Sequence, residues 1–225
     1  MKNILIITML IFIGCDDESS IVHGCLDSQA INYNSDANVD NNSCEYTVDD
    51  FAVIQELINI NELPITVSNF VTSFCSITGV DGETRIEQIN LSGYSNEYKL
   101  LFLPESIGNL TYLDSLVLYH HSITYFPESL MDIENLTRIR CSYCEIMEIP
   151  SNINQLTNLK TLLLRGNNIS SIPEALGYLS NLEELDLTDN QITGDIPQSV
   201  CNLIESNDLN IYHITSQNNL TNTCN

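Results

Sequence analysis

Four cationic side chains and two tyrosines in the middle of this chain are the residues best suited to bind a polar or charged ligand. The whole sequence contains seven Lys and Arg residues, and four of them fall between positions 138 and 165. Arginine and tyrosine are also enriched at the hot spots of binding interfaces. The set, which indicates recognition through ionic and hydrogen-bonding contacts, comprises Tyr119, Arg138, Arg140, Tyr143, Lys160 and Arg165.

A second group of residues has the spacing of a thiol motif. Cys141 and Cys144 form a CxxC pair, which is typical of redox or zinc sites. The sequence offers no second CxxC. Both cysteines also fit packing positions of the repeat described below, and we favour that interpretation.

A third group lies near the N-terminus and alternates in the manner of calcium ligands. Calcium loops place oxygen ligands at every second residue and need a glycine at their sharp turn. Here Asn41 stands where that glycine is expected, so the sequence leaves a solvated turn as the alternative to a calcium site. The candidate ligands are Asn34, Asp36, Asn38 and Asp40.

Composition narrows the function further. The chain has 225 residues, 43% of them hydrophobic, and a net charge of −23 from 30 acidic and 7 basic residues. Such a charge disfavours binding to nucleic acid or direct adsorption on anionic membranes. The sequence also lacks a nucleophile motif, a phosphate-binding loop, an HExxH motif and paired catalytic carboxylates. We therefore expect a binding protein and not an enzyme, with no cofactor apart from the calcium just considered.

The elements that must position these groups follow from an internal repeat. The repeat units, called rows below, begin at Leu113, Leu136, Leu159 and Leu182. Each row carries apolar residues at its first, fourth and sixth positions. An Ile-Pro or Phe-Pro pair follows, and then apolar residues spaced for a short helical turn. One such unit cannot bury its apolar face, whereas stacked copies bury a continuous core.

The rows resemble leucine-rich repeats of the pattern LxxLxLxxNxLxxIPxxIxxLxx over about residues 83–225. The resemblance implies an α/β solenoid, a horseshoe with a parallel β-sheet on its concave face and short helices or turns on its convex face. The ninth position would satisfy backbone groups between rows through an amide side chain, because buried polar groups need partners. Its occupants are His121, Cys144, Asn167 and Asn190, the first two being substitutes for asparagine.

In a solenoid of this type the strand residues between the apolar ones face the concave surface. We expect Lys160 to pair with Glu183 on the next strand, and we expect the three arginines to lack an internal partner, because no carboxylate faces them on the adjacent strands. The predicted face is basic in its middle and acidic on one side, suited to a protein or an acidic glycan; a solvated belt of charge is the alternative. Its candidate residues are Tyr119, His120, Arg138, Arg140, Tyr143, Lys160, Arg165 and Asp186.

The N-terminal end resembles that of a bacterial lipoprotein. Residues 1–14 have signal-peptide form, and Phe12-Ile13-Gly14-Cys15 resembles a lipoprotein cleavage site, which implies a lipid on Cys15. Residues 15–23 then form an acidic tether, whose Asp-Asp-Glu resembles a surface-export signal of the Bacteroidetes group. Residues 24–47 resemble a small Cys-bounded module of secreted proteins from that group, which implies a Cys25–Cys44 disulfide.

The resemblance also assigns the remaining segments. Residues 48–85 are expected to form a helical N-terminal cap with a helix from about Asp50, residues 86–205 the repeats, and residues 206–225 a C-terminal cap. A last strand is expected around Leu209 and Ile211. Cys201 and Cys224 suit a disulfide in the C-terminal cap, and Cys75 is expected to be a free, buried thiol.

We thus predict an outer-membrane lipoprotein exposed at the cell surface, where a repeat solenoid binds another macromolecule for recognition or adhesion. The alternative is an envelope scaffold or accessory protein that faces the periplasm.

Overall fold

The computed structural model describes residues 22–24, 34–40, 50–80, 83–92, 98–210 and 212–224. The chain divides into two units, Met1–Thr47 and Val48–Asn225, which are taken separately below. Within the described residues no helix has the length and apolar character needed to cross a bilayer. The predicted signal peptide, the lipidation site and the Cys25–Cys44 disulfide lie outside the described residues.

The described part of the first unit comprises two short paired strands and the turn that precedes the second one. Strand β1 (His23–Gly24) pairs in parallel with β2 (Val39–Asp40). The Asn34 Oδ1 atom accepts a hydrogen bond from the Asp36 N–H at 3.0 Å, and the Asn38 Oδ1 atom accepts one from the Val22 N–H at 3.2 Å. Two of the four candidate calcium ligands therefore use their oxygens to hold the loop, which favours the solvated-turn interpretation.

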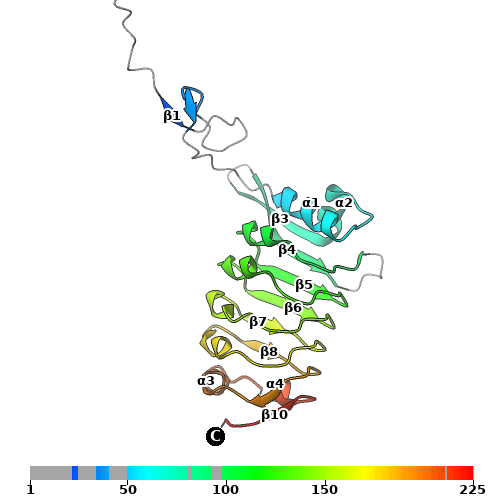
Figure 1. The fold of residues 1–225 in the computed structure, drawn as a ribbon, viewed down its shortest axis with the longest axis vertical. Coiled ribbons are helices and arrows are strands. Elements are labelled where there is room, and N and C mark those ends of the chain that lie inside the picture. The colour runs from blue at the N-terminus through cyan, green and yellow to red at the C-terminus, as the bar shows by residue number, and fades with distance from the viewer. Residues whose placement is uncertain are drawn as a thin grey trace, which may run out of the picture. The chain divides into compact units, whose positions relative to one another are not determined.

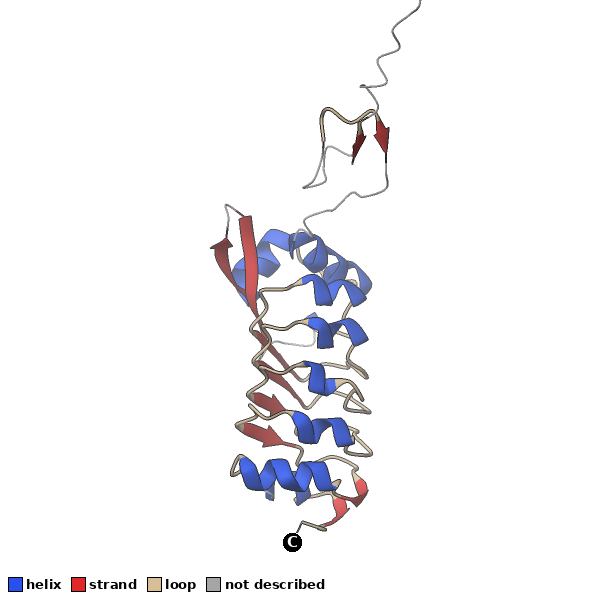
Figure 2. Cartoon of the chain, turned by 90° about the vertical axis from the view of Figure 1, so that its left-hand side faces the viewer, coloured by secondary structure: helices blue, strands red, loops and turns tan. Residues whose placement is uncertain are grey.

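The second unit is a stack of repeats with a sheet along one side and helical turns along the other (Figures 1 and 2). The sheet has the order β3-β4-β5-β6-β7-β8, in which every pair from β4 onward is parallel. Its strands are β4 (Glu83–Leu91), β5 (Ser115–Tyr119), β6 (Arg138–Ser142), β7 (Thr161–Leu163) and β8 (Glu184–Asp186).

The predicted repeat register is confirmed by the strand pairing. Ser115 lies opposite Arg138, Arg138 opposite Thr161, and Thr161 opposite Glu184, so each step along the stack is 23 residues. The first, fourth and sixth positions of all four rows are buried at no more than 4% exposure. The coil therefore has one continuous apolar core, because each row covers the apolar face of its neighbour.

The opposite side of each coil is a short 3₁₀ turn introduced by the proline of that row. Such turns span Glu105–Asn109, Glu128–Asp132, Ile153–Gln155 and Glu174–Tyr178. Pro104, Pro127 and Pro173 stand directly before three of them, where a missing N–H is harmless because the first donors of a helix have no internal partner. The turns bury Ile107, Leu130, Ile153 and Leu176 against the core.

The ninth positions form the expected ladder of internal hydrogen bonds. The Asn167 Oδ1 atom accepts from the Ile146 N–H at 3.0 Å, and its Nδ2 donates to the Cys141 and Leu164 carbonyls at 2.7 and 2.8 Å. Asn190 repeats this arrangement one row further on, with the Ile169 N–H and the Leu164 and Leu187 carbonyls.

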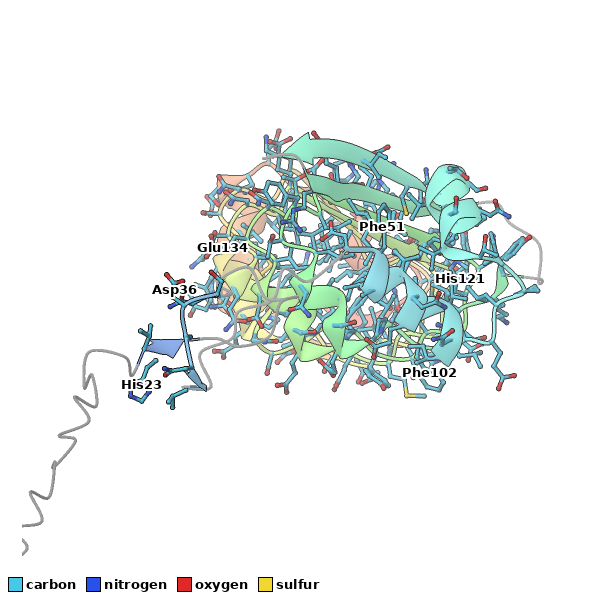
Figure 3. All side chains as sticks on the ribbon, turned by 90° about the horizontal axis from the view of Figure 1, so that it is seen from above. His23, Asp36, Phe51, Phe102, His121 and Glu134 are labelled. Carbon is cyan, nitrogen blue, oxygen red and sulfur yellow. A yellow bond between two sulfur atoms is a disulfide. The ribbon has the colours of Figure 1, made fainter. Side chains whose placement is uncertain are left out.

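His121 continues the ladder in the first row. It is 4% exposed, and its Nδ1 accepts from the Leu100 N–H at 3.1 Å. Burial lowers its pKa to about 4, so the imidazole is neutral at physiological pH. Figure 3 looks along the stack and shows Phe102 at the rim of the coil, in agreement with its 43% exposure.

The N-terminal cap contains more structure than the sequence predicts. Helix α1 (Asp50–Ile60) starts at the expected residue, but α2 (Val67–Phe74) and the antiparallel edge strand β3 (Cys75–Val80) follow it. Asp50, 2% exposed, joins cap to repeats, because its carboxylate accepts from the Ile86 N–H at 2.6 Å and lies 3.5 Å from Arg85. Asn61 extends the ladder by accepting from the Leu101 N–H at 2.6 Å.

The C-terminal cap corrects one prediction. Leu209 and Asn210 are not in a strand, and α4 (Tyr212–Thr215) occupies the place where the last strand was expected. This insertion shifts the ladder amide to Asn218, whose Oδ1 accepts from the Ile192 N–H at 3.2 Å. The other elements of this end are β9 (Thr193–Asp195), α3 (Gln198–Ser206) and β10 (Asn219–Thr221), which pairs with β9 in parallel.

The expected Cys201–Cys224 disulfide is present in the structure and closes the tail onto α3. Cys75 is a free thiol but is half-buried, where the sequence predicts full burial. Cys75 begins the edge strand β3 and therefore lies at the margin of the sheet, not in the core of the solenoid.

Candidate binding surface

The exposed face of the sheet consists of columns of side chains that run across the strands. The third positions form the column Gln88, Ser115, Arg138, Thr161 and Glu184, and the fifth positions the column Asn90, Val117, Arg140, Leu163 and Asp186. Neighbouring members belong to strands about 4.8 Å apart. The sheet thus brings the candidates Arg138 and Arg140 of β6 onto one surface with Asp186 of β8, as the repeat register predicts.

The prediction for Lys160 is confirmed and the prediction for two arginines is wrong. Lys160 pairs with Glu183 at 3.1 Å. Arg140, however, pairs with Glu184 at 3.7 Å, and Arg165 pairs with Asp189 through a 2.8 Å hydrogen bond from its Nε.

The reason lies in side-chain length and backbone direction. Arg140 reaches diagonally past the short Thr161 of β7 to the second strand along, which a comparison of adjacent strands does not consider. Among the described residues Arg138 has no ion pair, and it is half-buried in the middle of the sheet. The middle of the surface is therefore largely neutralised, and Arg138 is the cation left for a ligand.

A column of stacked groups stands where the strands end. The rings of His120 and Tyr143 stack with centroids 5.1 Å apart and an angle of 11°, and the guanidinium of Arg165 lies 5.9 Å from the Tyr143 ring. The hydrogen bond from Arg165 to Asp189 completes the column and raises the pKa of Arg165 further. Because both faces of the Tyr143 ring are covered, its edge and hydroxyl are what a ligand can contact.

The eighth position of each row has a left-handed backbone, which sets this column. The φ angles are 62° at His120, 55° at Tyr143, 68° at Gly166 and 57° at Asp189. The N–H groups of the first three still bond to the next row, and that of Tyr143 donates to the Arg165 carbonyl at 2.8 Å. A Cβ on Gly166 would lie 2.5 Å from the Tyr143 ring, so the glycine makes room for the column.

The C-terminal end of the sheet is hollowed. A hollow of about 390 Å³ is floored by Leu163, Leu185 and Leu209 and rimmed by Glu183, Glu184, Asp186, Asp208, Asn210 and His213. The Asp186 carboxylate accepts hydrogen bonds from the Thr188 N–H and hydroxyl at 2.9 and 2.7 Å. Although Asn210 and His213 are not in a strand, they lie beside the residues of β8.

The remaining candidates lie as follows. Tyr119 is half-buried at the end of β5, opposite Ser142. Cys141 and Cys144 are both buried inside the second row, as the packing interpretation requires. No group of three His, Cys, Asp or Glu side chains in the described ranges comes close enough to hold a metal ion.

Sequence reasoning missed a second row of asparagines. Asn135, Asn158 and Asn181 close their rows, and each donates from Nδ2 to the carbonyl 24 residues earlier, at 2.7, 2.9 and 2.8 Å. Their recurrence every 23 residues was visible in the sequence. Asp208 was missed as a surface residue for a different reason, because only the folded chain shows that it lies at the edge of the hollow beside β8.

Comparison with known proteins agrees with this architecture. A family model described as leucine-rich repeats, two copies, matches residues 157–200. No curated protein sequence matches the chain. The crystal structure of a plant ice-binding protein is similar with a TM-score of 0.62 and 23% identity; the match covers 76% of this chain and 56% of that one.

Two further structures give similar values. The ectodomain of the receptor kinase SOBIR1 from Arabidopsis thaliana matches with a TM-score of 0.61 and 21% identity over 78% of this chain and 96% of that one. The PEPR1–AtPEP1 structure matches with a TM-score of 0.55 and 22% identity over 76% of this chain and 28% of that one. Residues 157–200 therefore match leucine-rich repeats, and the fold is a leucine-rich repeat solenoid with a mostly parallel sheet.

Proposed function

We propose that this protein binds a protein ligand on the exposed face of its sheet and acts as a recognition or adhesion module of a bacterial envelope. Leucine-rich repeat domains typically mediate protein–protein binding and are generally not catalytic. The observation that carries the proposal is the arrangement of one surface. It combines the free cation Arg138, the stacked column around Tyr143 and the acid-rimmed hollow beside β8.

The charges favour a protein over an acidic glycan. An acidic glycan would need several free cations, but Lys160, Arg140 and Arg165 already pair with carboxylates. A polypeptide carries both signs, and it can place an acidic group near Arg138 and a basic group near the hollow at the other end. The PEPR1–AtPEP1 structure is named for a pair of components, and the solenoid of this chain resembles its fold.

The envelope location rests on the N-terminal sequence. Cleavage before Cys15 and lipidation would anchor the protein through acyl chains, each contributing about 0.8 kcal/mol per buried methylene. The acidic residues 16–18 then support export to the outer surface. A scaffold that faces the periplasm is the second candidate, and it is supported by the same lipid anchor without that export.

Site-specific photo-crosslinking would test the binding surface. A photoreactive amino acid at Val117 or Leu163 on the sheet should form adducts with a partner protein, whereas one at the exposed Ser171 or Ser180 should not. Arg138→Gln combined with Arg140→Gln should abolish the adducts. A matched control, Ser171→Glu with Ser180→Glu, also lowers the net charge from −23 to −25 and should leave them unchanged. Adducts that survive the arginine changes would refute the proposed surface.

Protease treatment of intact cells would test the location. Cleavage on unbroken cells, lost when Cys15→Ala releases the protein from the cell, supports surface display. Resistance until the outer membrane is broken would favour the periplasmic scaffold.

A further inference from the structure

The second repeat contains two thiols in direct contact inside the coil. The Cys141 Sγ and Cys144 Sγ atoms are 2.9 Å apart, which is about 0.9 Å more than the 2.0 Å of a disulfide bond. Neither belongs to the proposed binding surface, since Cys141 is fully buried and Cys144 is 6% exposed. None of the other full rows has two thiols at these positions, because leucine and asparagine or histidine occupy them.

The contact follows from the geometry of the repeat. The sixth position points inward from the strand, and the ninth position points inward again after the left-handed eighth residue. In the third and fourth rows the same two positions also touch, because Asn167 Nδ2 donates to the Leu164 carbonyl at 2.8 Å and Asn190 Nδ2 to the Leu187 carbonyl at 2.9 Å. Cysteines at positions six and nine are therefore brought together by the fold itself.

We propose that Cys141 and Cys144 form a reversible thiol–disulfide couple, a modification site that closes a four-residue ring within the second repeat. The protein already holds the Cys201–Cys224 disulfide, so it matures where disulfides persist. Cys75 provides the internal contrast. It is a free thiol with no partner cysteine in the described residues, and burial raises its pKa to about 12.

The two sulfurs differ in a way that assigns their roles. The Cys141 thiol donates a hydrogen bond to the Cys144 sulfur, which lowers the pKa of Cys144, whereas burial raises the pKa of Cys141. Cys144 is also the more exposed of the two. In thiol–disulfide exchange the thiol with the lower pKa and the greater exposure attacks first, and its neighbour resolves the mixed disulfide.

The exchange balances with a low-molecular-weight disulfide, R–S–S–R, as the oxidant. The Cys144 thiolate attacks one sulfur of the disulfide and releases R–S⁻. Cys141 then loses its proton and attacks the Cys144 sulfur of the mixed disulfide, which releases the second R–S⁻. The two thiolates released take up the two protons that the cysteines lost. Two protein thiols are thus oxidised by two electrons, and one small disulfide is reduced to two thiols.

The ring would enclose Ser142 and Tyr143, which stand between the two cysteines. Tyr143 has a φ of 55° and carries the stack with His120 and Arg165. Closing the ring therefore acts on the backbone that presents this column. This consequence for binding rests on the proposed function, whereas formation of the disulfide does not.

Mass spectrometry of the full-length protein would test the couple. The native protein is incubated with oxidised glutathione, its remaining thiols are alkylated, and it is digested with trypsin. Both cysteines fall in one tryptic peptide, residues 141–160, which contains no other cysteine. We expect most of this peptide to be unalkylated and two hydrogens lighter than the dithiol, and reduced glutathione should reverse the change. Further cleavage after Tyr143 should leave the two halves joined.

Variants then distinguish a couple from two separate thiols. Cys141→Ser should trap glutathione on Cys144, because the resolving thiol is gone, and Cys75→Ser should leave the result unchanged. The proposal is overturned if the wild-type peptide stays doubly alkylated while Cys201–Cys224 remains oxidised. It is equally overturned if wild-type Cys144 retains a stable glutathione adduct, because Cys141 then does not act on it. Neither outcome depends on whether the sheet binds a partner.

Discussion

The internal ladder makes a quantitative prediction at Asn167. In Asn167→Ala the Ile146 N–H and the Cys141 carbonyl lose the side chain that bonds them, while the Leu164 carbonyl keeps the Asn190 amide at 2.9 Å. Each buried polar group left without a partner costs about 1–3 kcal/mol. Two such groups at a position that is 5% exposed predict a loss of about 4 kcal/mol in the free energy of unfolding.

A matched control separates burial from the chemical change. Asn158 also donates one Nδ2 hydrogen bond, to the Glu134 carbonyl at 2.9 Å, but this asparagine is exposed. Water can replace its bond, so Asn158→Ala should cost at most about 1 kcal/mol. For a domain of this size 1 kcal/mol moves the melting temperature by about 2–4 °C, which predicts a fall of about 8–16 °C for Asn167→Ala and at most about 4 °C for the control.

The assay is thermal and urea unfolding followed by far-ultraviolet circular dichroism, with both variants measured beside the wild type. In a repeat protein each row is stabilised by its neighbours, so a solenoid that has lost the Asn167 hydrogen bonds need not unfold in one step. A separate unfolding transition at lower temperature in Asn167→Ala would therefore also agree with the prediction. If the two variants melt within about 2 °C of each other, the buried ladder does not stabilise the coil as argued.

Three more predictions concern the turn, the tail and a buried imidazole. Gly166→Ala should lower the free energy of unfolding by about 1–3 kcal/mol, because the new side chain adds backbone strain and clashes with Tyr143. It should also perturb the Tyr143 signals in near-ultraviolet circular dichroism. The control Gly194→Ala also has a positive φ but open space around it, so it should lose stability through backbone strain alone and leave those signals unchanged. Cys201→Ser should lose roughly 3 kcal/mol by opening the loop to the tail, and an unchanged urea midpoint would contradict this. His121 should destabilise the fold on acidification, because its folded pKa of about 4 lies below the unfolded value near 6.5 and the unfolded chain takes up the proton first. Stability should therefore fall from about pH 6.5 toward pH 4, and His121→Asn should make that dependence shallower when both proteins are titrated in urea.

The redox couple is in contact with the asparagine ladder, because Asn167 donates a hydrogen bond to the Cys141 carbonyl. Oxidation of Cys141 and Cys144 should leave the hydrogen bond from Asn167 to the Cys141 carbonyl in place, because Cys141 stays paired with Leu118 in the sheet while the ring acts on the backbone after it. We therefore expect the ladder variants to lose similar stability in the oxidised and reduced protein.

Periodicity in the amino-acid sequence is enough to specify the fold and most of the register. A spacing of 23 residues with apolar groups at three positions of each row can bury its core only by stacking, so the rows, their strands and the inward asparagines follow from the pattern. The same spacing predicts which residues share the exposed face, and Lys160 pairs with Glu183 as expected. The disulfide between Cys201 and Cys224 also follows from their place in the resemblance.

The electrostatics of that face, in contrast, depend on the folded coil. Arg140 bypasses the adjacent strand to reach Glu184, and Arg165 meets a carboxylate that a left-handed turn directs toward it, so groups expected to be free are paired. The helical insertion α4 interrupts the repeat after Leu209, and no periodic rule predicts an insertion. The contact between Cys141 and Cys144 depends likewise on the turn between them. Periodicity specifies which residues lie on a surface, whereas side-chain reach and local backbone conformation determine which of them meet.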